Sequence, residues 1–256
     1  RMQDLRNGLR TSQLAIQKVG WSANFMENHD QPRATSKYLL DQEANPDAVK
    51  TLGAMYFFLR GTPFIYQGQE LGMRNFTRTG IKEFNDISSI DQYYRSIEEG
   101  CSEEEALYYI NLRSRDNART PFPWKNAENA GFSNGTPWLK VTEHYPEINA
   151  DDQVQNPDSI YHFYRHLIEL RQNSKFKECL IYGDIMPLET QCQDMIAYMR
   201  KTEKETICCY FSFSAEVQNE FLPAEISEIV LSTKTAVYEG KEISLAPFQT
   251  FMAVIK

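Results

Sequence analysis

Two short apolar segments in the first third of the chain each end in a cluster of polar residues. Residues 21–26 form the first segment and precede Glu27-Asn-His-Asp-Gln-Pro-Arg33. Residues 62–66 form the second segment and precede Gln67-Gly-Gln-Glu70. Apolar runs of this length, bounded by polar and turn-forming residues, are typical of buried β-strands. The pattern therefore predicts two strands with polar residues at their carboxyl ends.

A helical pattern connects the two predicted strands. Asn45-Pro46-Asp47 combines a capping residue, a proline at the first helical position and an acid in the first turn. Apolar residues then follow at helical spacing on one face, and Gly61 is expected to end the helix. The residues on that face are Val49, Leu52, Tyr56 and Leu59. A strand, a helix and a strand with short connections make a βαβ unit with parallel strands, whose carboxyl ends carry the chemistry of such folds.

Further helical patterns flank this unit. Residues 11–20 carry apolar positions at helical spacing. Residues 71–156 are long and irregular, and the one helix expected there begins at a capping box formed by Ser102 and Glu105. A second capped helix is expected over residues 157–173. Irregular stretches of this length inside a compact domain usually carry function.

The periodicity changes near residue 180. Four short runs rich in β-branched and aromatic residues are separated by turn-forming residues, which is typical of an antiparallel sheet. These runs are residues 196–199, 206–213, 228–232 and 248–255. We therefore predict two domains, an α/β part over residues 1–176 and a small antiparallel β-domain over residues 177–256.

Composition narrows the class of partner. The 256 residues include 27 Lys and Arg against 35 Asp and Glu, which gives a formal charge of −8. Because binding a nucleic-acid backbone needs clustered positive charge, nucleic acid is not expected as a partner. No apolar run approaches the roughly 20 residues of a membrane span, so no membrane is expected either. The five cysteines, an odd count without framework spacing, favour reduced thiols and a cytoplasmic location.

The most suggestive candidate site is Asn28-His29-Asp30. A carboxylate at the carboxyl end of a buried parallel strand can stabilise positive charge that develops on a substrate. The adjacent His29 can donate a hydrogen bond to a substrate hydroxyl. A loop aspartate that caps the following turn fits the spacing equally well.

Other positions have two interpretations each. Glu70 could act as an acid or base, but a buried carboxylate bonded to backbone amides fits its position better. Arg119 lies among small and aromatic residues, where a planar guanidinium can recognise sugar hydroxyls, and an ion pair with Asp116 is a comparable alternative. His162 and His166 have a spacing that can bind zinc, but they fall on the polar side of a helix and are interpreted as solvated surface residues.

Several segments together resemble the α-amylase superfamily of glycoside hydrolases. Phe-Met-Glu-Asn-His-Asp at 25–30, followed by Gln-Pro-Arg, resembles the last catalytic stretch of that superfamily. Residues 61–72 are similar to its eighth-strand motif. Residues 115–121, which contain Ala-Arg-Thr-Pro, and residues 135–140 resemble the oligo-1,6-glucosidase and α-glucosidase branch. The similarity covers nearly the whole chain in the expected order.

The resemblance implies an α/β fold, namely the C-terminal part of a (β/α)₈ TIM barrel followed by a small antiparallel β-domain. It also implies a parent protein that acts as a retaining exo-α-glucosidase on short α-glucosides such as isomalto-oligosaccharides, malto-oligosaccharides or sucrose. By similarity, Asp30 is the catalytic aspartate that stabilises the transition state. His29, Gln31 and Arg119 are the residues that bind the sugar.

The nucleophile and the acid/base of a retaining glycosidase are two further carboxylates. In this superfamily they lie on the fourth and fifth barrel strands, and the sequence shows no match to either motif. We therefore expect the chain alone to be inactive and to need an N-terminal barrel portion. No cofactor is expected. The sequence shows no calcium loop of spaced acids, and no metal ligand is predicted.

Two positions depart from the pattern of this branch. Ser88 follows Asp86-Ile87 where the branch has Glu, and Phe122-Pro123 stands where it has Met-Gln. Both departures bear on linkage and leaving-group preference. The alternative functions are a transglycosylase such as a sucrose isomerase, a trehalose-6-phosphate hydrolase, and a non-catalytic barrel subunit. The chain retains His29, Asp30 and Arg119 together, which argues against a non-catalytic subunit, because a subunit without catalytic function need not keep all three.

Overall fold

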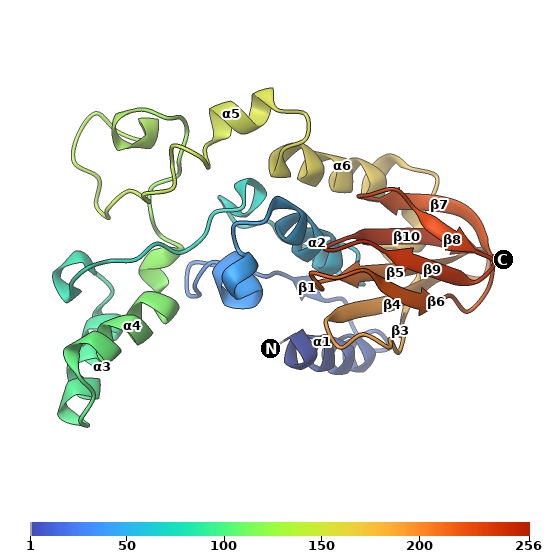
Figure 1. Ribbon diagram of the computed structural model, residues 1–256, viewed down its shortest axis with the longest axis horizontal. Coiled ribbons are helices and arrows are strands. Elements are labelled where there is room, and N and C mark those ends of the chain that lie inside the picture. The colour runs from blue at the N-terminus through green and yellow to red at the C-terminus, as the bar shows by residue number, and fades with distance from the viewer. Residues whose placement is uncertain (1) are drawn as a thin grey trace. The chain divides into compact units, whose positions relative to one another are not determined.

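The computed structural model describes residues 2–256, which divide into two compact units (Figure 1). The first unit contains the residues up to 24 together with 47–64 and 164–256, and the second contains 25–46 and 65–163. None of the helices described over residues 2–256 is long and apolar enough to cross a membrane.

The first unit contains the predicted βαβ arrangement. β1 (Ala23–Asn24) pairs in parallel with β2 (Thr62–Pro63), and α2 (Pro46–Phe57) lies between them in the chain. The parallel pair is therefore confirmed, although each strand has only two paired residues rather than the five or six expected. α2 begins at the predicted proline but ends at Phe57, before Gly61. Gly61 has φ +131, and a Cβ there would lie 2.3 Å from a backbone oxygen. Only glycine therefore fits at this position, directly before β2.

α2 is buried on nearly all sides, not on one face as predicted. Nine of its 12 residues are buried. The helix makes room for a neighbour at Gly53, where a Cβ would lie 2.8 Å from the hydroxyl of Tyr164 on α6 (Ile160–Asn173). A helix that is apolar all round is expected only in the interior of a protein.

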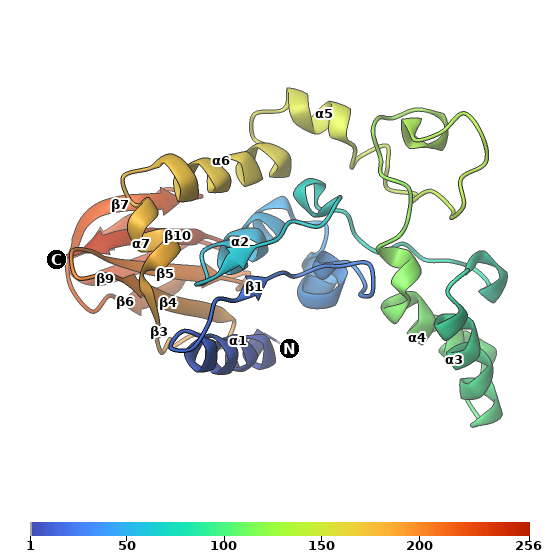
Figure 2. The same cartoon turned by 180° about the vertical axis from the view of Figure 1, so that it is seen from behind.

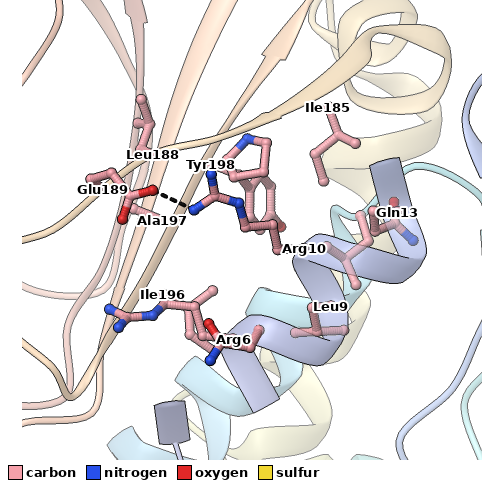
Figure 3. Close-up of a pocket in the computed structure, with 13 residues that line it drawn as sticks. Arg6, Leu9, Arg10, Gln13, Ile185, Leu188, Glu189, Ile196, Ala197 and Tyr198 are labelled. Carbon is pink, nitrogen blue, oxygen red and sulfur yellow. Dashed lines mark hydrogen bonds and ion pairs between the residues drawn. The ribbon is translucent and has the colours of Figure 1, made fainter. Parts of the chain in front are cut away.

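Two further helices of this unit, one at its start and one before the β-domain, also differ from the prediction. The pattern at 11–20 belongs to α1 (Met2–Ile16), which begins earlier and ends earlier. Figure 3 shows α1 facing the sheet, with Arg10 directed at Glu189 and forming an ion pair with it. A small cavity of about 60 Å³ lies between α1 and the strand residues. α7 (Lys177–Tyr182) was not predicted.

The start of α6 shows why its predicted bound was three residues early. The Asn156 side chain accepts the Asp158 N–H at 3.0 Å, which closes a turn instead of capping a helix. Ser159 then accepts the His162 N–H at 3.2 Å, so the serine hydroxyl bonds the first turn.

The predicted antiparallel β-domain is confirmed as two sheets. The five-stranded sheet has the order β3-β4-β5-β10-β7, and the three-stranded sheet has the order β6-β9-β8, with antiparallel pairs throughout. The bounds are β3 (Asp184–Pro187), β4 (Met195–Lys201), β5 (Thr206–Ser212), β6 (Gln218–Phe221), β7 (Ile226–Ser232), β8 (Val237–Glu239), β9 (Glu242–Leu245) and β10 (Thr250–Ile255). The four predicted runs correspond to β4, β5, β7 and β10.

The two sheets share a core. Tyr210 and Phe251 of the larger sheet pack with Ile243 and Leu245 of the smaller one. Figures 1 and 2 show the smaller sheet on one face of the larger sheet, with α2 and α7 on the other face. Cys208 and Cys209 are free and buried in β5, as their apolar surroundings predicted.

The second unit contains α3 (Ile87–Glu98), α4 (Glu103–Arg113) and α5 (Ala150–Gln155). The capping box is confirmed, because the Ser102 hydroxyl accepts the Glu105 N–H while the Glu105 carboxylate accepts the Ser102 N–H. The expectation of a single helix between residues 71 and 156 was wrong. α3 pairs with α4 around a small core that includes Tyr93 and Ile110.

Candidate active site

The loop that carries Asn28-His29-Asp30 has a buried base and an exposed tip. At the base, Arg33 Nη1 donates to Glu27 Oε2 at 3.1 Å, and both side chains are fully buried. At the tip, Asn28 Oδ1 accepts the Asp30 N–H at 2.8 Å. This hydrogen bond closes a turn in the chain, and the carboxylate of Asp30 itself is exposed there. The His29 Nε2 atom lies 3.2 Å from Asp30 Oδ2.

Arg119 lies directly against this tip. Its Nη2 atom donates to Asp30 Oδ1 at 2.9 Å, and its Nε–H donates to the carbonyl of His29 at 2.8 Å. Arg119 therefore pairs with Asp30 and not with Asp116. Asp116 is buried and accepts the N–H groups of Asn85 and Asp86 instead. Two of the residues singled out in the sequence are thus brought together.

A second arginine at Asp30 was missed in the sequence. Arg115 Nη1 donates to Asp30 Oδ1 at 3.4 Å, while its Nε and Nη2 atoms bond Asp86. Burial opposes ionisation of Asp86, but hydrogen bonds from Arg115 and Ser89 outweigh it and hold the pKa of Asp86 below its ordinary value. The available signal was the spacing of Arg115 and Arg119, which stand four residues apart in one motif.

Gln31 occupies a half-buried position beside the tip. Its side-chain oxygen accepts a hydrogen bond from Lys37 Nζ at 2.8 Å. No hydrogen bond among residues 2–256 joins the Gln31 side chain to Asp30 or Arg119, whereas the His29 side chain, which contacts Asp30, is 69% exposed.

Aromatic side chains share a cavity with Arg119. Arg119 and Gln67 line a cavity of about 240 Å³ whose other walls include Phe122 and Trp138. The indole N–H of Trp138 donates to Asn85 Oδ1 at 3.0 Å, which fixes the orientation of the exposed ring. Planar polar groups beside an aromatic ring match the polar edge and apolar face of a sugar.

Glu70 has the structural arrangement favoured from the sequence. Its carboxylate bonds backbone N–H groups of its own turn, including that of Gly68, and its Oε2 atom is buried without a hydrogen-bond partner among residues 2–256. Burial raises the pKa of Glu70, and the backbone hydrogen bonds only partly oppose that rise. Among residues 2–256, no hydrogen bond or ion pair joins Glu70 to Asp30 or Arg119.

Replacing this carboxyl by an amide is expected to change how stability depends on pH. Because burial raises the pKa of folded Glu70 above 4.5, its stabilising effect is complete below pH 4.5 and is lost as the pH rises through the folded-state pKa. Glu70→Gln should therefore show a smaller fall in unfolding free energy between pH 4.5 and neutral pH. Urea unfolding at several pH values measures it, with the exposed Glu104→Gln as control. An unchanged pH profile in Glu70→Gln would contradict the assignment.

The two helical histidines form no metal site within residues 2–256. His162 Nε2 is 2.9 Å from the carbonyl of Val154, and His166 is exposed. Within the part of the chain that the structure describes, no group of three His, Cys, Asp or Glu side chains could hold a metal ion.

These features define a class of protein. A parallel βαβ unit precedes an antiparallel β-domain, and a charged cluster follows the first parallel strand at its carboxyl end, where enzymes with parallel α/β barrels carry their sites. Residues 1–183 match the family model of the alpha-amylase catalytic domain. The chain belongs to the alpha-amylase family.

Relatives within the family match nearly the whole of this chain but less than half of their own length. The chain is 34% identical to an oligo-1,6-glucosidase of Bacillus cereus, over 98% of this chain and 46% of the relative. A glucan 1,6-alpha-glucosidase of Streptococcus pneumoniae is also 34% identical, over 91% and 43% respectively. The crystal structure of the trehalulose synthase MutB from Pseudomonas mesoacidophila superposes with a TM-score of 0.92 at 35% identity, over 99% of this chain and 46% of that one. The fold is thus that of the C-terminal part of the barrel with its β-domain, and the chain spans about half the length of the curated relatives it matches.

Proposed function

We propose that the chain is the C-terminal portion of a retaining exo-α-glucosidase that hydrolyses short α-glucosides. The observation that carries the proposal is the contact of Asp30 with Arg119 at the exposed tip of a loop that follows a parallel strand. In this proposal Asp30 stabilises the positive charge of an oxocarbenium-like transition state. His29, Gln31 and Arg119 bind the hydroxyl groups of the glucosyl unit.

The ion pairs support an electrostatic role for Asp30 rather than proton transfer. Two guanidiniums donate to the same oxygen of its carboxylate, so this group serves here as a hydrogen-bond acceptor. Asp86, the neighbouring carboxyl, is buried and paired with Arg115. A retaining mechanism needs a nucleophile and an acid/base about 5–5.5 Å apart. We assign both to an N-terminal barrel portion that would pair with this chain.

The same proposal divides the chain into two domains. Residues 1–176 belong to the barrel, and residues 177–256 form the C-terminal β-domain. The proposed substrate is a small oligosaccharide, and the proposal includes no cofactor. A cytoplasmic location remains a prediction from the odd number of cysteines.

Assays of the isolated chain and of the longer protein that contains it test the proposal. On p-nitrophenyl α-glucoside, the isolated chain should show no turnover, because two essential carboxylates are missing. The product of the complete reading frame should hydrolyse the substrate and release α-glucose first, as ¹H NMR of the anomeric proton records. Turnover by the isolated chain, or release of β-glucose, would contradict the proposal.

A transglycosylase is the second candidate, favoured by the close structural similarity to the trehalulose synthase MutB. Both functions would use Asp30 in the same way, and they differ in whether water or a second sugar accepts the glucosyl unit. Incubating the complete product with sucrose distinguishes them. Hydrolysis gives glucose and fructose, whereas isomerisation gives a disaccharide with a new linkage.

A further inference from the structure

We propose that Arg33 is a positioning residue that fixes Asp30 and Arg119 relative to each other. The catalytic consequence of this proposal rests on the proposed function, whereas the geometric part does not. In the part of the chain that the structure describes, Arg33 forms no hydrogen bond or ion pair with either side chain of the exposed pair. It acts through the base of the loop that carries Asp30 and through the backbone that carries Arg119.

The first link closes the base of the loop. Glu27 and Arg33 stand six residues apart, on either side of the tip, and their side chains pair at 3.1 Å with no exposed surface. The second carboxylate oxygen of Glu27 accepts the Ala34 N–H at 2.9 Å. Burial raises the pKa of Glu27, and the charge of Arg33 opposes that rise. The two ends of the loop are thereby held together beneath Asp30.

The second link fixes the backbone in front of Arg119. Arg33 Nε donates to the carbonyl of Asn117 at 3.2 Å, and Nη2 donates to the carbonyl of Ala118 at 3.4 Å. The Ala118 carbonyl also accepts the Tyr66 hydroxyl at 3.1 Å and the Gln67 side-chain amide at 3.1 Å. Three donors therefore converge on the residue that precedes Arg119.

The third link is the contact of the exposed pair itself. From its fixed backbone, Arg119 reaches the His29 carbonyl and the Asp30 carboxylate at the tip of the loop. The base of the loop, the backbone before Arg119 and the exposed pair are thus joined in one continuous network of hydrogen bonds, and Arg33 lies at its centre. Removing the hydrogen bonds of Arg33 would allow both members of the pair to shift. A shift of about 1 Å at a reacting group can lower the rate by about 10²-fold.

The chemistry of the side chain explains why an arginine occupies this position. Its planar fork donates at once to Glu27 and to three backbone carbonyls, those of Gln67, Asn117 and Ala118. A lysine has one donor centre and cannot bond all four groups. A buried ion pair is often no more stabilising than apolar residues of the same volume. Stability alone is therefore a weak reason for this pair, and positioning is a stronger one.

Hydrogen exchange of the Arg119 side chain in the isolated chain tests the geometric part. In ¹⁵N-labelled protein the Arg119 Nε–H should exchange slowly, because it donates to the His29 carbonyl. Arg33→Lys should accelerate that exchange at least about tenfold, as expected when a hydrogen bond of a charged group is weakened. The double variant Glu27→Leu with Arg33→Met, which leaves no buried unpaired charge, should fold and show the same acceleration.

Arg171→Lys is the matched control. Arg171 is another buried arginine that bonds backbone carbonyls, and it belongs to the first unit, whereas the exposed pair belongs to the second. It should lower stability while leaving the Arg119 exchange slow. Slow Arg119 exchange in a folded Arg33 variant would overturn the proposal, and so would fast exchange in the unaltered chain.

Activity of the complete product tests the catalytic part. Arg33→Lys should lower kcat/KM on p-nitrophenyl α-glucoside by about 10²-fold, whereas Arg171→Lys should leave it unchanged at a temperature where both variants are folded. If Arg119 exchange accelerates but no variant or parent hydrolyses the substrate, the proposed function fails and the positioning stands. If the parent is active and Arg33→Lys alters neither exchange nor kcat/KM, the positioning fails and the function stands.

Discussion

Arg200→Met is expected to lower the free energy of unfolding by about 3–5 kcal/mol, a large part of the stability of an ordinary domain. Arg200 is fully buried and donates to the carbonyls of Phe58, Leu180, Ile181 and Gly183. These carbonyls lie at or just beyond the C-terminal ends of α2 and α7, where the helix itself supplies no donor. Methionine would leave them buried and without that donor.

The positive charge of Arg200 is stabilised by the peptide dipoles at the C-terminal ends of helices. Among the described residues no carboxylate forms an ion pair with it, and the partially negative ends of two helices take that place. Arg171 completes the arrangement by donating to the carbonyls of Phe57, Gly61 and Leu180, and burial lowers its pKa to about 10. Two arginines thus join α2 to the start of the β-domain.

Urea unfolding of the isolated chain measures the effect of Arg200→Met. Lys201→Met, at the exposed next position of the same strand, is the control and should change stability by less than about 0.5 kcal/mol. Arg200→Lys should fall between them, because it keeps the charge but has fewer donors. Equal stability of Arg200→Met and Lys201→Met would mean that the cost of burying the guanidinium cancels its hydrogen bonds.

The elements that could be predicted from the sequence are those with local signals. Pro46 fixes the first turn of α2, and Ser102 with Glu105 fixes the first turn of α4, so neither start depends on distant residues. The bounds of β1 and β2 depend on pairing across about 40 residues, and both strands proved shorter. The strand order β3-β4-β5-β10-β7 is set by contacts that no local pattern encodes.

The helix α3 was missed for a different reason. The apolar residues of its inner face, Ile90, Tyr93 and Ile97, stand at helical spacing. The surrounding polar residues favoured an irregular loop, because the partner that buries this face, α4, becomes evident only in the fold.

The candidate site divides in the same way. The motif around Asp30 and the motif around Arg119 were both recognisable, but their contact spans 89 positions. Proximity in the sequence made Asp116 an equal partner for Arg119, and only the fold turns Asp116 inward to bond backbone N–H groups. Glu27 was interpreted as part of a polar loop, although burial makes it the partner of Arg33.

Asp30→Asn in the product of the complete reading frame is expected to lower kcat on p-nitrophenyl α-glucoside by about 10²–10³-fold. The amide has nearly the shape of the carboxylate, and its oxygen can still accept the hydrogen bonds of Arg115 and Arg119. It lacks the negative charge that would steady the cationic glucosyl centre. The effect should therefore fall mainly on kcat. KM should change less, because Arg119 keeps its bond to the His29 carbonyl.

The control for this variant is Asp91→Asn, an exposed position on α3 outside the charged cluster. It removes one negative charge from the same unit and should leave kcat within about twofold, as expected for surface charges in solvent. Urea unfolding of both variants should give similar midpoints, which separates a lost charge from a lost fold. If Asp30→Asn matched the control in kcat, the charge of Asp30 would have no part in the transition state, and the glucosidase mechanism proposed for this cluster would be wrong.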